Sequence, residues 1–298
     1  MSKWDIEYLK LCKKILNEGI KSPNRTGIDT YKIPGYHFHL DVGEEFPILT
    51  TKQTYSRQAF LEMLWIYQQA SNDVRDLQNV NVHIWDEWEI AEDGYWYAKQ
   101  YKTDKDGNQV LEFDKKFFGK KYAHTIGTAY GYVVKKYDLA HRAIKLIKED
   151  PFNRRNVISL WQEEDLETGV LKPCVWSSEW DVTDGKLNAW VHQRSCDVPL
   201  GLPFNVTQYA ALLYLFAKEA NLKPGTLDWS IKDAQIYENQ IDGIKKQLER
   251  ENLQPLPAPT LWINPDKHFD EYDFSKDCKD IKVLNYKHHG PIKFKIAK

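Results

Sequence analysis

Apolar residues recur at helical spacing in five segments of the chain, so each segment is predicted to form a helix. The first segment ends at Gly19, and the second begins at Ser56, a residue type favoured at helix N-termini. The apolar face of the first is formed by Ile6, Leu9, Cys12 and Leu16, and that of the second by Phe60, Leu61, Leu64 and Trp65. The predicted helices cover residues 5–20, 56–70, 140–150, about 205–222 and about 233–250.

Strands are predicted where polar and apolar residues alternate or where β-branched residues gather. Residues 30–42 alternate with Pro and Gly punctuation, and residues 154–161 form a β-branched run after the helix that Pro151 ends. Residues 95–123 are rich in lysine and aromatic residues and contain an Asp-Gly turn signal, so a hairpin-like surface insertion is predicted there. No repeat or clear linker divides the chain, which favours one domain over residues 1–298.

A hairpin is predicted in the segment CVWSSEWDVTDGKLNAWVHQRSCD. Its centre is Asp184-Gly185, a favoured pair for a two-residue type I′ turn. Residues equally distant from the turn face each other, which places Cys174 opposite Ser195 and Arg194 diagonal to the thiol. A guanidinium near a thiol stabilises the thiolate, the form that attacks carbon.

Cys174 therefore has two open interpretations. A free cysteine in a strand is most often a buried packing residue. The Pro-Cys step and the Arg-Ser pair at the matching register favour a nucleophile instead. Packing suits Cys12, Cys196 and Cys278 better, since Cys12 lies on a helix face and Cys196 should point away from Ser195 across the pleat.

Composition and charge restrict the classes of partner. Lys and Arg total 41 against 43 Asp and Glu, so the net charge of -2 does not favour nucleic acid as a partner. Four scattered cysteines without a CxxC pair indicate neither a disulfide framework nor a metal site. The N-terminus has no apolar core of signal-peptide length, and no apolar run approaches the roughly 18 residues of a membrane span, so a cytoplasmic protein is predicted.

Nine motifs resemble those of one enzyme family. The residues PCV (173–175) and QRSCDVPLGLPFN (193–205) closely resemble the signature of the thymidylate synthase family. The other motifs are NRTG (24–27), FPILTTK (46–52), LEMLW (61–65), HIWDEW (83–88), AYGY (129–132), NRRNV (153–157) and DAQIY (233–237). They occur in the family's order, and the resemblance covers nearly the whole chain outside residues 95–123.

The resemblance implies an α/β (α+β) fold, a thymidylate-synthase-like single domain with a mixed, twisted sheet. Helices would flank one sheet face, and a homodimer would form through the other. The implied reaction is reductive methylation of dUMP to dTMP with 5,10-methylenetetrahydrofolate as cosubstrate, without a metal. In it, Cys174 adds to carbon 6 of uracil, so that carbon 5 can attack the methylene group. Two alternatives remain: a 5-hydroxymethylase of dUMP or dCMP that adds water to the same intermediate, and a nucleotide- or RNA-binding regulator without turnover.

The resemblance also gives roles to single residues. Glu62 would relay protons, since desolvation within an apolar helix raises a carboxyl pKa. Asn205 would donate to O4 and accept from N3–H of uracil, and its alternative role is the N-cap of the following helix. Asp197 would hold the pterin, Tyr130 would lie near the reacting carbons, and Tyr237 would bind the sugar 3′-hydroxyl.

The complete sets follow from the same motifs. Catalysis is assigned to Cys174, Glu62, Tyr130, Arg194, Asn205 and Asp197. Nucleotide binding is assigned to Arg25, Arg154, Arg155, Arg194, Ser195, Cys196, Asp197, Asn205, Gln235 and Tyr237, with Arg154 and Arg155 reaching in from a second subunit. Folate binding is assigned to Tyr55, Ile84, Trp85, Trp88, Asp197, Leu200, Gly201, Phe204 and Ala297.

The chain departs from the family's usual residues at four positions. Val175, Tyr55 and Gln235 each stand where histidine is common, and Gln235 is the one expected at the sugar hydroxyl. Lys298 ends the chain where the family usually has an apolar residue, whose carboxylate helps the tail close over the ligands. A looser tail would admit water and favour the hydroxymethyl product. Trp85 argues for the methyl product, because it matches the tryptophan that shields the reactive carbon in methyl-forming members.

Overall fold

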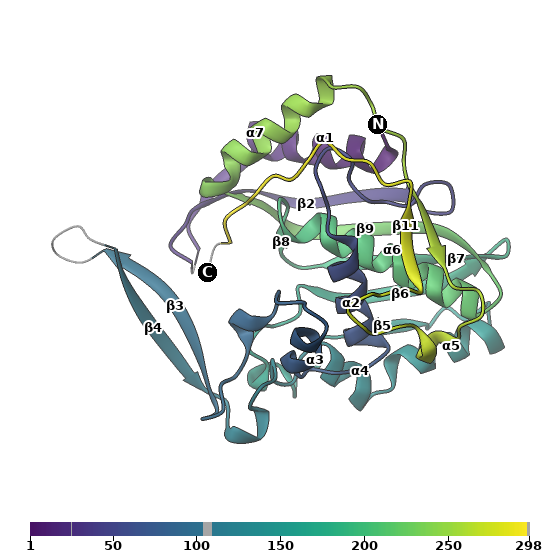
Figure 1. Cartoon of the computed structure of the whole chain (residues 1–298), viewed down its shortest axis with the longest axis horizontal. Helices are drawn as coiled ribbons and strands as arrows, with labels where there is room; N and C mark the ends of the chain where they lie inside the picture. Colours follow the sequence, from purple (N-terminus) through teal and green to yellow (C-terminus); the bar gives the residue numbers. More distant parts are fainter. Residues whose placement is uncertain (25, 104–108, 297–298) are drawn as a thin grey trace.

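The computed structural model describes residues 1–24, 26–103 and 109–296, and its centre is a seven-stranded sheet packed with helices (Figure 1). The helices are α1 (Lys3–Glu18), α2 (Ser56–Tyr67), α3 (Val74–Asn79), α4 (Gly131–Lys136), α5 (Leu139–Glu149), α6 (Gly201–Glu219) and α7 (Ile241–Glu249). The central strands are β1 (Ile20–Ser22), β2 (Thr30–Asp41), β5 (Val157–Ser159), β6 (Val175–Thr183), β7 (Lys186–Gln193), β8 (Cys196–Asp197) and β9 (Lys223–Tyr237). Short 3₁₀ segments are η1 (Asp86–Trp88), η2 (Lys120–Tyr122), η3 (Leu166–Thr168), η4 (Glu238–Gln240), η5 (Arg250–Asn252) and η6 (Phe269–Glu271). Two separate strand pairs are β3 (Tyr95–Thr103) with β4 (Gln109–Phe117), and β10 (Thr260–Ile263) with β11 (Ile281–Leu284).

The central sheet is mixed. Its strand order is β1-β2-β9-β7-β6-β5, with β8 also paired to β9. The long strand β9 runs antiparallel to β2 and parallel to β7 and β8. The predicted fold class, a mixed sheet with flanking helices, is therefore confirmed.

One face of the sheet is covered and the other is open in the described chain. Along β7, Leu187, Ala189 and Val191 are buried, as expected for the period-two alternation of a strand with one covered face. Helix α6 packs on β7 and β9, α1 on β2 and β9, and α5 on β5 and β6. On the other face, Trp190 is 46% exposed and its ring contacts those of His37 and His192.

Helix α1 forms close to the predicted range, but its buried face differs from the predicted one. Ile6 is 52% exposed, whereas Leu9 and Cys12 are buried as expected. The buried side is centred on Trp4, Tyr8, Leu11, Cys12 and Ile15. The predicted face included Ile6 because it is apolar, but single apolar residues are common on protein surfaces. Trp4 and Tyr8 are buried in the core instead.

The helix predicted over 233–250 is wrong in its first part. Residues up to Tyr237 belong to β9, which pairs with β2 on one side and with β8 on the other. Sheet pairing on both sides outweighs local propensity here. After η4, α7 begins only at Ile241. Helix α6 likewise begins at Gly201, four residues before the predicted start.

The β6–β7 hairpin has the predicted turn but shifts its register at the far end. Asp184 and Gly185 have φ values of 50° and 67°, as a type I′ turn requires. The predicted pairing holds from Thr183↔Lys186 to Ser177↔His192, and an irregularity between Val175 and Ser177 then shifts it by one residue. The prediction that Ser195 faces Cys174 is therefore wrong, because this bulge places Arg194 opposite the cysteine, with the Arg194 N–H donating to the Cys174 carbonyl at 2.9 Å.

Strands β3 and β4 form the hairpin predicted within residues 95–123. Among the described residues they pair only with each other, and Figure 1 shows the hairpin extending outward from the side of the molecule near α3. Its base is held to the rest of the chain by the Trp96 indole, which donates to the Glu87 carbonyl at 2.9 Å. Within the described residues, no helix combines the length and the apolar character needed to cross a membrane.

Candidate active site

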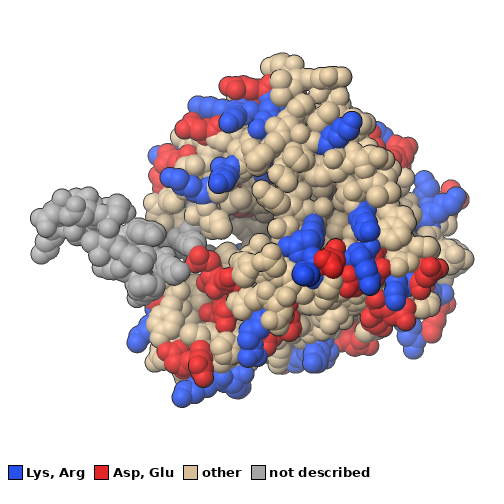
Figure 2. Space-filling model, in the orientation of Figure 1, with Lys and Arg blue, Asp and Glu red and all other residues tan. Residues whose placement is uncertain are grey.

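A cavity of about 990 Å³ lies where α2, η1, β8, the start of α6 and the C-terminal tail meet. Figure 2 shows the surface hollowed near the centre of the view, and acidic and basic side chains are interspersed on that face. The volume lies at the upper end of the range for small-molecule sites. All six residues assigned to catalysis line this cavity: Cys174, Glu62, Tyr130, Arg194, Asn205 and Asp197.

Cys174 lies in the cavity immediately before β6, beside the side chain of Arg194. Arg194 Nη2 is 4.0 Å from the Cys174 sulfur. Two backbone carbonyls fix the guanidinium, which donates from Nε to Pro173 at 2.9 Å and from Nη2 to Lys172 at 2.8 Å. A cation held at this distance stabilises a thiolate, so the geometry suits Cys174 to nucleophilic attack.

Tyr130 supports the cysteine from the other side. Its phenolic oxygen accepts a hydrogen bond from the Cys174 backbone N–H at 3.2 Å. Tyr130 has a φ of 50°, a strained conformation for a residue with a side chain, immediately before α4. Burial raises the pKa of Tyr130, so its phenol keeps its proton at neutral pH.

Glu62 is buried because α2 is surrounded by protein on all sides. Every residue of α2 from Ala59 to Tyr67 is buried. Burial raises the pKa of Glu62 to about 7, although donated hydrogen bonds oppose the shift. The donors are the Trp85 indole, at 2.6 Å, and the Gln208 amide. Glu62 can therefore take up and release a proton near neutral pH, as its assigned role requires.

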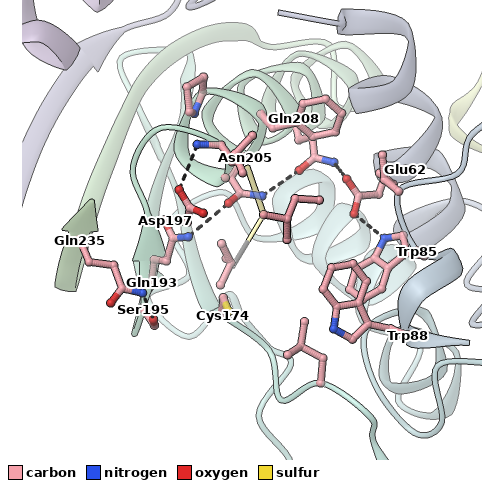
Figure 3. Close-up of a pocket in the computed structure, with 18 of the residues that line it drawn as sticks. Glu62, Trp85, Trp88, Cys174, Gln193, Ser195, Asp197, Asn205, Gln208 and Gln235 are labelled. Carbon is pink, nitrogen blue, oxygen red and sulfur yellow. Dashed lines mark hydrogen bonds between the residues drawn. The ribbon is translucent and has the colours of Figure 1, made fainter. Parts of the chain in front are cut away.

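Side-chain amides link Glu62 to Asn205 in one continuous chain of hydrogen bonds (Figure 3). The Trp229 indole donates to Gln193 Oε1 at 3.0 Å, and Gln193 Nε2 donates to Asn205 Oδ1 at 3.2 Å. Asn205 Nδ2 donates to Gln208 Oε1 at 3.2 Å, and Gln208 Nε2 donates to the Glu62 carboxylate. Because α6 begins at Gly201, Asn205 lies inside the helix and is not its N-cap.

Asp197 is held between the body of the protein and the C-terminal tail. Its carboxylate accepts from the Leu200 N–H at 3.1 Å and from Gln240 Nε2 at 3.0 Å. Gln240 Nε2 also donates to the Lys295 carbonyl in the tail at 3.1 Å. Burial raises the pKa of Asp197 and lowers that of nearby Lys52 to about 8, because it makes both charged forms costly.

Polar side chains gather at another part of the cavity wall. Ser195, Gln235 and Tyr237 all line it, and Gln235 Nε2 donates to the Ser195 hydroxyl at 3.4 Å. Arg194 reaches the same wall. This group offers a cation, hydroxyls and an amide, which are suitable partners for a phosphate and a sugar hydroxyl.

Several assigned residues do not line the described cavity. Arg154 and Arg155 are exposed and lie outside it. The Cys196 side chain is fully buried away from the cavity, so its thiol cannot meet a ligand there. Arg25 and Ala297 lie outside the described residues.

The remaining wall is apolar and aromatic. Trp85 packs edge-on against both Trp88, at 5.6 Å between ring centroids, and Tyr130, at 5.3 Å. Every described residue assigned to folate binding lines the cavity: Tyr55, Ile84, Trp85, Trp88, Asp197, Leu200, Gly201 and Phe204. Such a wall fits a flat, largely apolar ligand.

Among the described residues, no group of three or more His, Cys, Asp or Glu is placed to hold a metal ion.

Five polar or aromatic residues of this site are among those that the sequence-based assignment missed. They are Lys52, Trp96, Gln193, Gln208 and Gln240. Gln193 precedes the assigned Arg194, and Gln208 lies one helical turn after Asn205, so both could have been found from their positions. Gln240 and Trp96 reach the site only through the fold, and no local pattern marks them.

These features describe a cavity of small-molecule size in which a thiol lies beside a fixed cation. The chain matches the family model described as "Thymidylate synthase" over residues 6–298. It is 44% identical over 298 residues to the thymidylate synthase of Clostridium beijerinckii, covering 100% of both chains. It is 35% identical over 294 residues to that of Mycoplasma pneumoniae, covering 98% of this chain and 99% of the relative. A solved structure, thermostable thymidylate synthase A from Bacillus subtilis, superposes with a TM-score of 0.81 at 32% identity, covering 99% of both chains.

The chain belongs to the thymidylate synthase family. The resemblance inferred from the motifs is therefore confirmed, and with it the class of enzyme, a folate-dependent one-carbon transferase.

Proposed function

We propose that the protein catalyses the reductive methylation of dUMP to dTMP, with 5,10-methylenetetrahydrofolate as cosubstrate and dihydrofolate as the second product. The observation that carries this proposal is the shared cavity of Cys174, Arg194, Asn205 and Glu62. It brings together a nucleophile, its cation, an amide that can read a pyrimidine and a carboxyl group that titrates near neutral pH.

Cys174 is the nucleophile in this proposal. Its sulfur forms a bond to carbon 6 of the uracil ring, and the electron pair of the C5=C6 double bond moves to carbon 5. Carbon 5 thereby becomes able to attack an electrophilic carbon. Arg194 stabilises the thiolate before attack, and with Ser195 and Arg25 it binds the phosphate of the nucleotide. Once bonded to the one-carbon unit, carbon 5 loses its proton as the folate nitrogen leaves that unit. Hydride addition to the resulting methylene group then expels the thiolate and restores the C5=C6 double bond.

Asn205, Tyr237 and Gln235 position the nucleotide. The Asn205 amide donates to O4 and accepts from N3–H of uracil, whereas cytosine presents the opposite pattern. Tyr237 and Gln235 bind the sugar hydroxyl. The amide of Gln235 can donate or accept a hydrogen bond, but unlike histidine it cannot carry a charge.

Glu62 moves protons to and from the base, which its pKa of about 7 allows. Tyr130 keeps its proton and helps place the cysteine through the 3.2 Å hydrogen bond to its backbone. Trp85 excludes water from the reacting carbons. Its indole is 7% exposed and is held by Glu62, so it forms a fixed part of the wall.

The residues present fit a reduced folate. The aromatic wall of Trp85 and Trp88 suits a flat ring, and the carboxylate of Asp197 can accept hydrogen bonds from a pterin. The cosubstrate supplies a one-carbon unit and a hydride. The tail closes over it, with Ile292 and Ile296 lining the cavity.

A homodimer through the open sheet face belongs to the same proposal. That face presents Trp190 at 46% exposure and Trp176 at 38%, which are costly to leave in water. Arg154 and Arg155 are exposed outside the cavity of their own chain, as expected if they complete the phosphate site of a partner. We also propose that residues 1–298 act as one cytoplasmic catalytic domain.

The product identifies the reaction. Purified protein would be incubated with dUMP and methylenetetrahydrofolate. The mass of the nucleotide product would be measured by mass spectrometry, and the formation of dihydrofolate would be followed by absorbance. dTMP with matching dihydrofolate is the expected result. A hydroxymethyl nucleotide with tetrahydrofolate would instead make the protein a hydroxymethylase, and binding without any product would favour the regulator.

A further inference from the structure

Gln208 connects two residues to which the proposed function gives separate tasks. Its Oε1 accepts from Asn205 Nδ2 at 3.2 Å, and its Nε2 donates to the Glu62 carboxylate (Figure 3). Gln208 Nε2 also donates to the Ala59 carbonyl at 3.3 Å. The side chain is buried, with 4% exposure. Both hydrogens of its amide and one lone pair are thus used within the protein, so Gln208 has a fixed orientation.

The ends of the amide chain set its direction. At one end the Trp229 indole, which can only donate, faces Gln193 Oε1 and turns Gln193 Nε2 towards Asn205. At the other end, the Glu62 carboxylate takes the donor group of Gln208. All donors therefore point from Trp229 towards Glu62. Reversing any one amide would place a donor against a donor and an acceptor against an acceptor.

This direction determines what Asn205 can offer a ligand. One hydrogen of Nδ2 is used by Gln208 and one lone pair of Oδ1 by Gln193. One hydrogen and one lone pair remain, in a fixed order. That order suits a base with an acceptor at position 4 and a donor at position 3, which describes uracil, while cytosine has the reverse.

We propose that Gln208 is a positioning residue that fixes the amide orientation of Asn205 against the Glu62 carboxylate and thereby makes the site select uracil over cytosine nucleotides. The inference rests on the proposed function, since it concerns the same site. It adds a residue that acts through Asn205 and Glu62, and with it a physical link between base recognition and the proton-transfer group.

The test compares Gln208→Met with Gln68→Met. Methionine keeps the length of the side chain but removes both polar atoms. Gln68, directly after α2, is a matched control, because it is also buried and donates to two carbonyls, those of Phe269 and Tyr272, but has no hydrogen bond to Asn205 or Glu62. Dissociation constants for dUMP and dCMP would be measured by calorimetry, which needs no turnover.

We expect the dissociation constant for dCMP divided by that for dUMP to fall about tenfold in Gln208→Met. A tenfold change corresponds to the free energy that one buried hydrogen bond typically contributes. The ratio should be unchanged in Gln68→Met, although both variants lose stability. An unchanged ratio in folded Gln208→Met would overturn the inference.

Gln208→Glu distinguishes the contact with Asn205 from the contact with Glu62. It also provides a second test if Gln208→Met does not fold. The new carboxylate still accepts from Asn205 but no longer donates to Glu62. We expect the selection of dUMP to be largely kept, while Glu62 titrates at higher pH by ¹³C NMR of labelled glutamate, since the lost hydrogen bond favoured the charged form and the new carboxylate repels it. A Glu62 titration identical to that of the native protein would contradict the link. Failure of the native protein to bind dUMP would instead refute the proposed function itself.

Discussion

Arg194 lies directly opposite Cys174 across the β6–β7 hairpin, with Nη2 4.0 Å from the cysteine sulfur. The contact depends on the one-residue shift between Val175 and Ser177, because an unshifted hairpin would have placed Ser195 there. The bulge therefore has a chemical consequence, since it exchanges a hydroxyl for a cation beside the thiol.

Replacing Arg194 should slow the reaction of Cys174 with an alkylating reagent. In Arg194→Met the thiolate loses its cation, and we expect alkylation at pH 7 to slow by roughly tenfold, equivalent to about 1.4 kcal/mol. Arg194→Lys should recover part of the rate, because it keeps the charge but not the fork that grips two carbonyls. Alkylation of Cys174 would be followed by peptide mass spectrometry. Equal rates in all three proteins would show that the guanidinium does not activate the thiol.

Glu62 should make stability fall as pH rises. Burial raises its pKa in the folded state to about 7, so the folded protein binds more protons than the unfolded chain between the ordinary value of 4.5 and 7. The stabilisation is present below pH 4.5 and is lost as pH rises through 7. Between pH 4.5 and pH 8 the native protein should lose up to about 3 kcal/mol of unfolding free energy through this group, and Glu62→Gln should not show that loss. The turnover of Glu62→Gln should fall by about a hundredfold or more. Urea unfolding at both pH values gives the comparison, and a native protein with no such pH dependence would contradict the shifted titration.

Asp5 should be important for stability rather than chemistry. Its buried carboxylate accepts five hydrogen bonds, from the Ser2 hydroxyl and from the N–H and hydroxyl groups of Thr50 and Thr51. Asp5→Ala leaves these donors without a partner and should lower the free energy of unfolding by about 3 kcal/mol. Glu18→Ala, which removes an exposed pair with Lys14, should cost less than about 0.5 kcal/mol. Similar losses in both variants would show that Asp5 does not anchor the Thr50–Thr51 segment.

Gln240 should control the C-terminal tail. Its side chain accepts from the Tyr237 N–H at 3.1 Å and donates to both Asp197 and the Lys295 carbonyl. Gln240→Met should loosen the tail, raise KM for the folate several-fold and speed removal of terminal residues by carboxypeptidase. The matched variant is Gln247→Met, since Gln247 is also buried but donates to Thr51. Equal digestion of both variants would count against this role.

The sequence allowed prediction of what local chemistry determines. The pair Asp184-Gly185 favours a type I′ turn through its own backbone preferences, and the turn forms as predicted. The apolar residues around Glu62 in the sequence likewise predicted that its pKa is raised. The bulge before Ser177 could not be predicted, because one extra residue in a strand leaves the alternation around it almost unchanged. Neither could the strand at residues 233–237 or the contacts of Gln240, since both depend on segments distant in the chain.

The central claim is that Cys174 forms the covalent bond to the nucleotide. Its most direct test is the turnover of Cys174→Ser, with Cys278→Ser as a control at a buried cysteine that does not line the cavity. We predict that Cys174→Ser binds dUMP but loses at least about a thousandfold in kcat, as expected for removal of a nucleophile, while Cys278→Ser stays active. A Cys174→Ser variant that kept the full rate would contradict the account.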